Sequence, residues 1–438
     1  MHKTFGENRK RIGNGAKETR ALPVLRRAVL LCLSLLLGLG LLLTGCTGPA
    51  VETGTGQNEL LEDPSAAQRA GSAAVRTDFD RGVKELLASM TLREKVGQLF
   101  IVRPEWLNLV VDENGTILGG GASVKYMNDT IADVLQRYPA GGVALYSRNI
   151  VDPQQIKELN AGLQTASRIP LYIAVDEEGG IITRIACDKE FSVPKYPSPE
   201  YVARTGGILG VQEMGSTIGS YMKEYGFNMN FAPVADVNTN PYNPIIGNRA
   251  FSSDPAVAAE MAAAFAKGLR QEGVIPVYKH FPGHGDTAED SHASVAVSYK
   301  TFAELDAAEW LPFRKMTAAD YVMVGHIALP NVTGDMTPAT MSSQIINDIL
   351  RKHLGFEGLI MPDSLVMQAI TKLYSTEEAA VKTLELGCNI ILDPANYFVA
   401  FDAVLNAVET GRISEEQLDA AVLRILKSKR DYGILELN

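Results

Sequence analysis

Eight short apolar segments recur between residues 96 and 394, and this repetition constrains the fold more than any other feature of the chain. Each segment is flanked by Gly, Pro or Asp, as is typical of strands buried in a parallel sheet. The eight segments are VGQLFIVR (96–103), GGVALYS (141–147), PLYIAVD (170–176), FNMNFAPVAD (227–236), VIPVYKHF (274–281), YVMVGHIA (321–328), GLIMPD (358–363) and CNIILDP (388–394).

Amphipathic stretches lie between most of these segments. Two of them, residues 254–273 and 414–433, begin at a typical helix N-cap residue, Asp254 or Ser414, and end at Gly. Eight strands alternating with helices predict an α/β fold, a (β/α)8 TIM-type barrel that forms a single catalytic domain over residues 79–438. A doubly wound open sheet is the alternative, and the count of eight strands favours the barrel.

Ionisable residues stand at the carboxyl ends of six of the predicted strands. In a barrel these ends meet at one face, where active sites lie. Each Asp alone could equally be a helix N-cap, but six such strand ends are more than capping requires. The residues are Asp176, Asp236, Lys279 with His280, His326, Asp363 and Asp393.

The stretch KHFPGHGDTAEDSHASV (279–295) holds three of the six histidines of the chain. Pro282 and Gly283 separate His280 from His284, so these two do not share a helix face as in helical zinc sites, and we expect no metal and no cofactor. In a loop, the spacing of Asp290 and His292 allows the carboxylate to orient the imidazole for proton transfer. A surface Asp–His pair that closes the loop is the alternative reading.

The N-terminus has the features of an export signal. Eight basic residues precede an uncharged apolar run that ends in Leu-Thr-Gly-Cys46. This ending is similar to a bacterial lipobox, which predicts a lipoprotein signal peptide over residues 1–46, lipidation at Cys46 and a flexible tether over residues 47–78. An uncleaved transmembrane anchor is the alternative. Both readings place the rest of the chain outside the cytoplasm, at the bacterial cell membrane.

The negative charge of the chain beyond residue 46 excludes non-specific nucleic-acid binding. Without residues 1–46 it carries 33 basic and 49 acidic residues, and a body so acidic repels a phosphate backbone. The two cysteines of this body, Cys187 and Cys388, do not have the spacing of metal ligands, and we expect both to be buried among apolar residues.

We expect the protein to be a monomer.

The motifs around these residues resemble those of glycoside hydrolase family 3, in particular its NagZ-type β-N-acetylglucosaminidases. The similarity covers roughly residues 80–430, and KHFPGHG followed by DSH is its most specific part. The other matching motifs are VDEEGGIITR (175–184), NMNFAPVADVNTNP (228–241), NPIIGNRAFSSDP (243–255), MVGHIALP (323–330) and GLIMPDSLVMQAI (358–370).

The resemblance implies roles for individual residues. Asp363 matches the nucleophile of the family, and His292, assisted by Asp290, matches the acid/base. Five further residues match positions that hold the sugar hydroxyls. They are Asp176, Arg184, Arg249, Lys279 and His280.

The resemblance implies a retaining glycosidase that removes terminal N-acetylglucosamine from peptidoglycan-derived fragments through a covalent glycosyl-aspartate. Three alternatives remain open on the sequence alone. They are a family 3 β-glucosidase or β-xylosidase, a phosphorylase that uses phosphate in place of water, and a non-catalytic sugar-binding lipoprotein.

Overall fold

The computed structural model describes residues 81–112, 117–288 and 294–437. All described residues belong to one compact unit, which lies within Asp63–Asn438. Cys46, the predicted signal peptide and tether, Asp290 and His292 lie outside the described residues.

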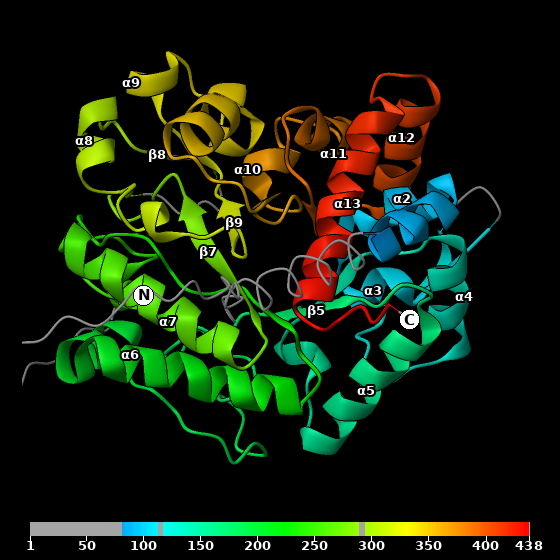
Figure 1. The fold of residues 1–438 in the computed structure, drawn as a ribbon, viewed down its shortest axis with the longest axis horizontal. Coiled ribbons are helices and arrows are strands. Elements are labelled where there is room, and N and C mark those ends of the chain that lie inside the picture. The colour runs from blue at the N-terminus through cyan, green and yellow to red at the C-terminus, as the bar shows by residue number, and fades with distance from the viewer. Residues whose placement is uncertain (1–80, 113–116, 289–293, 438) are drawn as a thin grey trace, which may run out of the picture. The chain divides into compact units, whose positions relative to one another are not determined.

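Eight parallel strands form the main sheet, in the order β11-β9-β7-β6-β5-β4-β1-β12. Figure 1 shows β5, β7 and β9 among the helices around the sheet. Each predicted apolar segment contains one of them, so the predicted barrel architecture is confirmed. The strands are β1 (Phe100–Val102), β4 (Gly142–Leu145), β5 (Tyr172–Val175), β6 (Met229–Asn230), β7 (Ile275–Phe281), β9 (Tyr321–Val324), β11 (Leu359–Pro362) and β12 (Ile391–Leu392).

Strands β11 and β12, at the two ends of this order, close the ring through individual hydrogen bonds. The amide of Asn389 donates to the carbonyl of Ile360 (2.8 Å), and the amide of Leu365 donates to the carbonyl of Leu392 (3.0 Å). At this seam, between β11 and β12, the hydrogen bonds come from the segments around the strand ends and not from a regular ladder.

Helices surround the sheet. The two predicted N-caps are confirmed: Asp254 accepts from the amides of Ala256 and Val257, and Ser414 accepts from the amide of Gln417. Residues 81–89 are helical, and the bounded helices are α2 (Leu92–Gln98), α3 (Pro104–Leu107), α4 (Asp129–Arg137), α5 (Pro153–Ala166), α6 (Pro199–Glu224), α7 (Pro255–Gln271), α8 (Phe302–Ala307), α9 (Pro330–Thr333), η5 (Gln344–His353), α10 (Gln368–Thr371), α11 (Thr376–Glu385), α12 (Tyr397–Glu409) and α13 (Glu415–Asp431).

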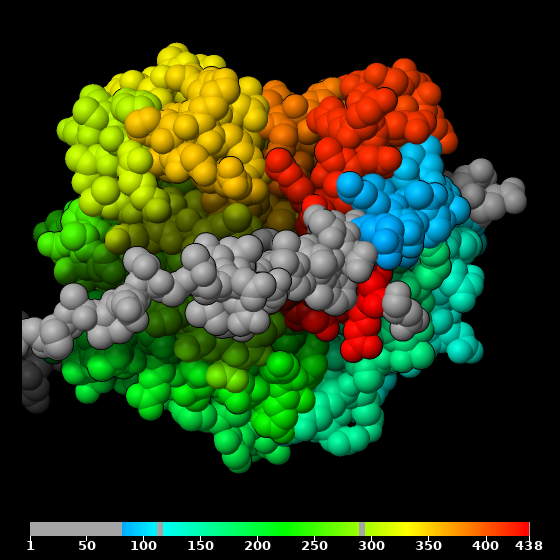
Figure 2. All heavy atoms as spheres, in the orientation of Figure 1, coloured from blue at the N-terminus to red at the C-terminus, as the bar shows by residue number. Residues whose placement is uncertain are grey.

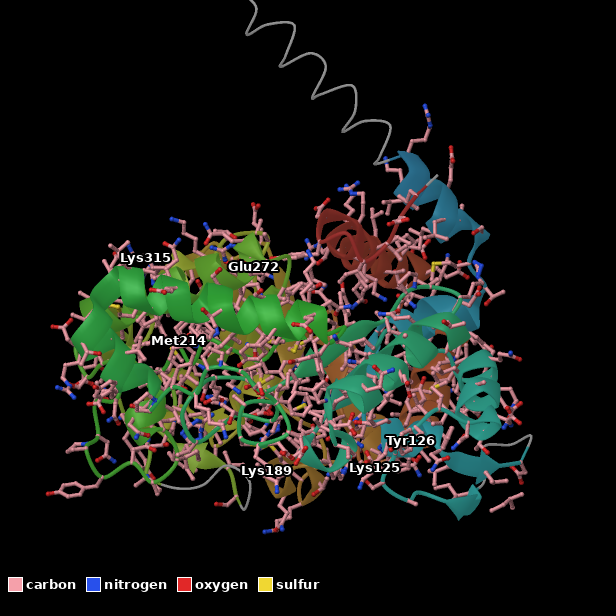
Figure 3. The ribbon with its side chains drawn as sticks, turned by 90° about the horizontal axis from the view of Figure 1, so that it is seen from below. Lys125, Tyr126, Lys189, Met214, Glu272 and Lys315 are labelled. Carbon is pink, nitrogen blue, oxygen red and sulfur yellow. The ribbon has the colours of Figure 1, made fainter. Side chains whose placement is uncertain are left out.

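Helices α6 and α7 pack against one another particularly closely (green in Figure 2). A Cβ atom on Gly215 would lie 2.3 Å from the Phe265 carbonyl oxygen, so this contact requires glycine. Figure 3 shows the pair from another side, with Met214 on α6 and Glu272 just beyond the end of α7. Ser216 donates to Glu272 across this contact (2.5 Å).

The shorter elements connect or cover the ends of the barrel. Strands β2 and β3 form an antiparallel pair, and β8 pairs in parallel with β10. Their bounds, with those of the 3₁₀ turns, are β2 (Leu109–Val111), β3 (Ile117–Gly120), β8 (Ala296–Val297), β10 (Ile327–Ala328), η1 (Ser147–Asn149), η2 (Gly247–Arg249), η3 (Phe313–Lys315) and η4 (Ala339–Met341).

Two details differ from expectation. Cys388 is buried as predicted, but Cys187 is exposed, because it lies in the long loop after β5. Strand β6 is only two residues long within the predicted segment 227–236, where Pro233 has no amide to donate. Of the helices in the described ranges, none is both long and apolar enough to cross a bilayer.

Candidate active site

A cleft of about 310 Å³ lies at the carboxyl ends of the barrel strands. All six predicted site residues within the described ranges line this cleft, although they come from segments spread over nearly 190 positions. They are Asp176 after β5, Arg184 in the loop that follows, Arg249 in η2, Lys279 and His280 in β7, and Asp363 after β11.

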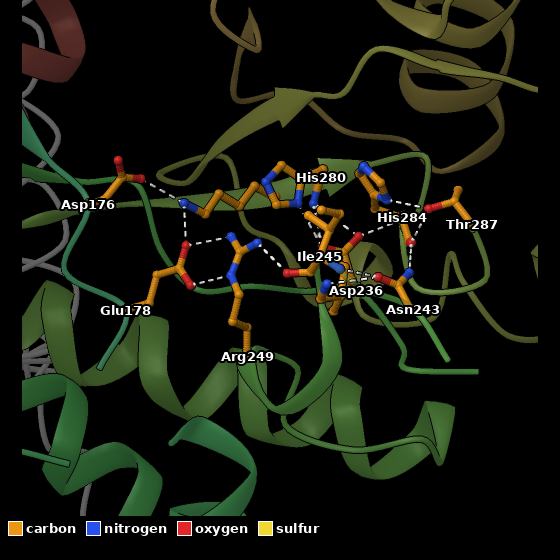
Figure 4. A network of polar contacts seen from close by, with 11 residues as sticks. Asp176, Glu178, Asp236, Asn243, Ile245, Arg249, His280, His284 and Thr287 are labelled. Carbon is orange, nitrogen blue, oxygen red and sulfur yellow. Dashed lines mark hydrogen bonds and ion pairs between the residues drawn. The ribbon is translucent and has the colours of Figure 1, made fainter. Parts of the chain in front are cut away.

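A buried ionic network includes Asp176, Glu178 and Arg249 (Figure 4), and Lys279 is at its centre. Its Nζ atom lies 2.8 Å from Asp176 Oδ1 and 2.6 Å from Glu178 Oε1. Glu178 also receives a bidentate pair from Arg249, at 2.9 Å from Nε and 2.8 Å from Nη2. Burial alone would raise the pKa of Glu178, but Lys279 and Arg249 lower it to about 2. The network therefore contains ionised carboxylates held by two fixed cations.

Within the part of the chain that the structure describes, some hydrogens of these cations have no acceptor and can contact a ligand. An ammonium has three N–H donors, and Lys279 uses two on Asp176 and Glu178. Arg249 has five, of which two contact Glu178 and one contacts the Ile245 carbonyl (2.9 Å). At the mouth of the same cleft, Arg184 Nη2 lies 3.4 Å from Asp176 Oδ2.

Asp236 joins His280, in β7, to His284 in the loop that follows β7. Its carboxylate lies 2.7 Å from His280 Nδ1 and accepts from the His284 amide at 2.6 Å. Burial raises the pKa of Asp236, yet the contacts with His280 and His284 outweigh this and hold the pKa below its ordinary value. Because Asp236 contacts Nδ1, the Nε2 atom of His280 is the nitrogen that remains for a ligand.

Glu177 organises the loop after β5 from inside the protein. Its carboxylate accepts from the amides of Arg184 (2.7 Å), Ile185 (2.9 Å) and Ala186 (3.0 Å), and from the hydroxyl of Tyr221 (2.9 Å). These bonds fold the loop back onto the strand end, which brings Arg184 beside Asp176.

Asp363 lies on the opposite side of the barrel mouth, where β11 ends. Its amide donates to the Val324 carbonyl (2.7 Å), and its Oδ1 accepts from the Ser364 amide (2.7 Å). Burial raises the pKa of Asp363, but the positive potential of His326, His280 and Lys279 and the Ser364 amide together lower it. The carboxylate is therefore ionised at neutral pH, as a nucleophile must be.

A second polar cluster lines the cleft beyond Asp363. Asp393, which follows β12, forms an ion pair with Arg103 (2.6 Å) and accepts from the Ser364 hydroxyl (2.8 Å). Tyr146 and Arg148 line the same side, with the guanidinium 5.0 Å from the centre of the tyrosine ring. Burial, together with Asp393 and Asp176, raises the pKa of Tyr146 well above its ordinary value, so its hydroxyl stays protonated.

Sequence reasoning did not select Glu178, Tyr146, Arg103 or Ser364 as site residues. Glu178 had a detectable signal, because it stands two positions after Asp176 at the same strand end. Asp393 was noted as an ionisable strand end, and its partner Arg103 ends the first predicted segment. Their pairing depends on which strands are neighbours in the ring, β1 and β12, and no short spacing reveals that.

The cleft has the groups that a retaining glycosidase uses on a neutral sugar. It provides an ionised carboxylate, a set of fixed donors and acceptors for hydroxyl groups, and apolar lining residues in or directly after separate strands, namely Phe231, Met323 and Leu392. Among residues 81–112, 117–288 and 294–437 no group of three or more His, Cys, Asp or Glu side chains is arranged to hold a metal ion.

Comparison with known proteins gives a consistent result. Residues 91–428 match the family model described as the glycosyl hydrolase family 3 N terminal domain. The β-hexosaminidase A of Pseudoalteromonas piscicida is 33% identical over 335 residues, which are 70% of this chain and 56% of that protein. The chain thus spans little more than half the length of this relative.

Solved structures are similar over the same region. A glycoside hydrolase family 3 β-N-acetylglucosaminidase from Paenibacillus sp. has a TM-score of 0.71 and 35% identity, covering 79% of this chain and 63% of that one. The β-glucoside phosphorylase BglX bound to 2FGlc has a TM-score of 0.68 and 26% identity, covering 81% of this chain and 61% of that one.

Proposed function

This chain belongs to glycosyl hydrolase family 3, and from that premise we propose that it is a retaining exo-β-N-acetylglucosaminidase. The observation that carries the proposal is the position of the ionised Asp363 in one cleft with the network around Lys279. Asp363 attacks the anomeric carbon and forms a glycosyl ester, and water then hydrolyses this ester with net retention.

The terminal sugar is held by the donors and acceptors at the other end of the cleft. Asp176 accepts hydrogen bonds from sugar hydroxyls, while Lys279, Arg184, Arg249 and His280 donate to the hydroxyl oxygens. Because Lys279 and Arg249 are already fixed by Glu178, they lose little side-chain freedom when a sugar binds.

His292 is proposed as the general acid and base, oriented by Asp290. Both residues lie outside the described ranges, and their role rests on the family resemblance of the KHFPGHG–DSH motif. An imidazole with an ordinary pKa near 6.5 suits protonation of the leaving oxygen and later deprotonation of water near neutral pH.

Replacing His292 with alanine should therefore lower kcat/KM for a GlcNAc-MurNAc disaccharide by about 10²–10⁴-fold, and much less for a nitrophenyl glycoside. The reason is that a basic sugar oxygen needs a proton to leave and a nitrophenolate does not. The measurement is a plot of log kcat/KM against leaving-group pKa. His353→Ala is the matched control, because His353 also pairs with an aspartate, Asp306 (2.7 Å), on the surface. An unchanged slope for His292→Ala would contradict the assignment.

One assay separates the proposed activity from its alternatives. An aryl N-acetyl-β-glucosaminide should be hydrolysed faster than the corresponding glucoside or xyloside. A β-glucoside phosphorylase is among the similar structures, so the assay is run with and without inorganic phosphate. A sugar phosphate as the main product would identify a phosphorylase, and no turnover of any glycoside would support a sugar-binding protein.

The proposed substrates are peptidoglycan-derived fragments that end in N-acetylglucosamine, and the proposed location is the outer side of the bacterial cell membrane. The basic, apolar and Leu-Thr-Gly-Cys46 segments of the N-terminus support this location. An anchored glycosidase at that surface meets cell-wall fragments first.

Cys46→Ser should abolish lipidation, because the lipid is joined to the cysteine thiol. The expected result is loss of the membrane-bound, lipid-labelled mature form. Membrane fractionation and metabolic labelling with a fatty acid measure this loss. Cys187→Ser is the matched control, since Cys187 is an exposed cysteine in the body of the protein. A wild-type protein that keeps residues 1–46 and takes up no lipid would favour the transmembrane anchor.

A further inference from the structure

Three groups of Ser364 are fixed by three different partners. Its amide donates to Asp363 Oδ1 (2.7 Å), its carbonyl lies 3.0 Å from His326 Nε2, and its hydroxyl donates to Asp393 Oδ2 (2.8 Å). The residue directly after Asp363 is thus held through both of its backbone groups and its side chain.

The contact with His326 defines the state of that ring. A carbonyl oxygen only accepts, so Nε2 of His326 carries a hydrogen. The other ring nitrogen, Nδ1, lies 3.0 Å from the hydroxyl of Thr340. Both His326 and Thr340 are fully buried, so this side of Ser364 is a rigid support.

Asp393 forms the support on the other side. Its Oδ1 lies 2.6 Å from Arg103 Nε, as an ion pair rather than an aligned hydrogen bond, and its Oδ2 accepts from Ser364. Its backbone has φ +46°, a left-handed conformation that is rare outside glycine but tolerated by Asp and Asn. A site with this strain is maintained only where the surrounding contacts determine it.

These contacts lie at the seam of the barrel. On one side β11 has a regular ladder with β9, from Leu359 to Pro362. On the other side the segment after Asp363 is joined to the end of β12 by the amides of Leu365 and Val366, which donate to the carbonyls of Leu392 (3.0 Å) and Asp393 (3.1 Å). The direction of the chain at Asp363 therefore depends on Asp393 on the side that has no ladder.

We propose that Arg103, Asp393 and Ser364 form a positioning relay that fixes the direction of the Asp363 carboxylate. Arg103 holds Asp393, Asp393 holds the Ser364 hydroxyl, and Ser364 holds Asp363 through its amide. The inference rests on the proposed function, in which Asp363 is the nucleophile. None of the three relay residues takes part in bond making, so each acts through Asp363.

The test measures the attack of Asp363 directly. A 5-fluoro N-acetylglucosaminyl fluoride traps the glycosyl-enzyme, so its inactivation rate constant reports nucleophilic attack, while the inhibition constant of free N-acetylglucosamine reports sugar binding. Ser364→Ala and Asp393→Asn should each lower the inactivation rate constant by about 10–100-fold, since a shift of about 1 Å in a reacting group can cost 10²-fold. The inhibition constant should stay within about twofold, because the hydroxyl-binding groups are untouched.

The double variant tests whether the two residues act as one unit. If they do, Ser364→Ala/Asp393→Asn should be no slower than the slower single variant. Ser216→Ala is the matched control, because Ser216 also donates to a carboxylate, Glu272 (2.5 Å), far along α6 from the strand ends. It should leave both constants unchanged. If Ser364→Ala does not fold, Ser364→Cys keeps the shape with a weak donor and gives the same comparison.

The outcomes separate this inference from the proposed function. If mass spectrometry finds no label on Asp363 of the wild-type protein, the proposed function fails. If Asp363 is labelled but the single variants react at the wild-type rate, or their losses multiply in the double variant, or binding weakens in parallel, the relay is refuted and the proposed function stands.

Discussion

Replacement of Asp363 by glycine is expected to lower kcat/KM for an aryl N-acetyl-β-glucosaminide by about 10⁴-fold or more, because the variant has no group that can form the covalent intermediate. The stability of the variant should change far less than its activity. Burial raises the pKa of Asp363, but His326, His280, the Ser364 amide and Lys279 together lower it, so the carboxylate is ionised, and its loss relieves the burial of one charge. Steady-state kinetics together with a urea unfolding curve measure both quantities.

A small external nucleophile should restore turnover of the Asp363→Gly variant. Azide can enter the space left by the carboxylate and attack the anomeric carbon from the same face, so the expected product is the α-glycosyl azide, identified by NMR. Asp348→Asn is the control for removal of a carboxylate, because Asp348 is an exposed partner of Lys352. A β-configured azide, or no response to azide, would mean that another group is the nucleophile.

Replacement of Lys279 by methionine is expected to destabilise the protein by about 3–5 kcal/mol and to abolish measurable activity. The change leaves Asp176 and Glu178 without the ammonium that lies within 2.8 Å of both, and removing one partner of a buried ion pair costs about this much. Loss of activity follows because Asp176 no longer has a fixed position. The free energy of unfolding is measured by urea titration at neutral pH.

The pH dependence of this effect has a definite sign. The folded-state pKa of Glu178 is about 2 against an ordinary 4.5, so its ionic contacts stabilise the wild-type protein fully above pH 4.5 and are lost as the pH falls towards 2. In the Lys279→Met variant, the ionic contacts of Glu178 contribute less to the free energy of unfolding. The difference in unfolding free energy between wild type and Lys279→Met should therefore narrow as the pH falls through that interval.

A second substitution distinguishes charge from packing as the cause. Lys279→Met/Asp176→Asn should regain part of the lost stability, because Asp176 keeps, among the described residues, only the Arg184 contact at 3.4 Å once Lys279 is removed, whereas Glu178 keeps its bidentate pair with Arg249. Lys352→Met is the control for loss of an ammonium, since Lys352 and Asp348 form an exposed pair, and it should cost at most about 1 kcal/mol. Equal destabilisation in the single and double variants would show that packing, not charge, causes the loss.

The barrel was predictable because its signals are local. Each strand is a short run of apolar residues bounded by Gly, Pro or Asp, and each long helix has its own cap, such as Asp254 or Ser414. The fold class then follows from counting alternations. Strand lengths were predicted less well, as β6 shows: the regular strand ends at Asn230, although backbone hydrogen bonds to β7 continue as far as Ala235.

The site was predictable only where it follows strand ends or a family motif. Asp176 and Asp363 each follow a strand and Lys279 lies near the end of one, and a barrel brings such positions together. The contacts that fix these groups were not predictable. Glu177 reaches the amides of Arg184 and Ile185 through a loop conformation, and no sequence pattern gives such a conformation in advance.

The ring of strands makes activity a measure of complete folding. Asp176 follows the third strand along the chain, Lys279 belongs to the fifth and Asp363 follows the seventh, so no contiguous half of the barrel contains all three. A fragment that folds alone would bind neither end of the sugar correctly. A partly unfolded molecule should have no activity, not a reduced activity. Turnover can therefore serve as a reporter of complete folding, and its loss during denaturation measures the fraction of molecules in which the ring of strands has come apart.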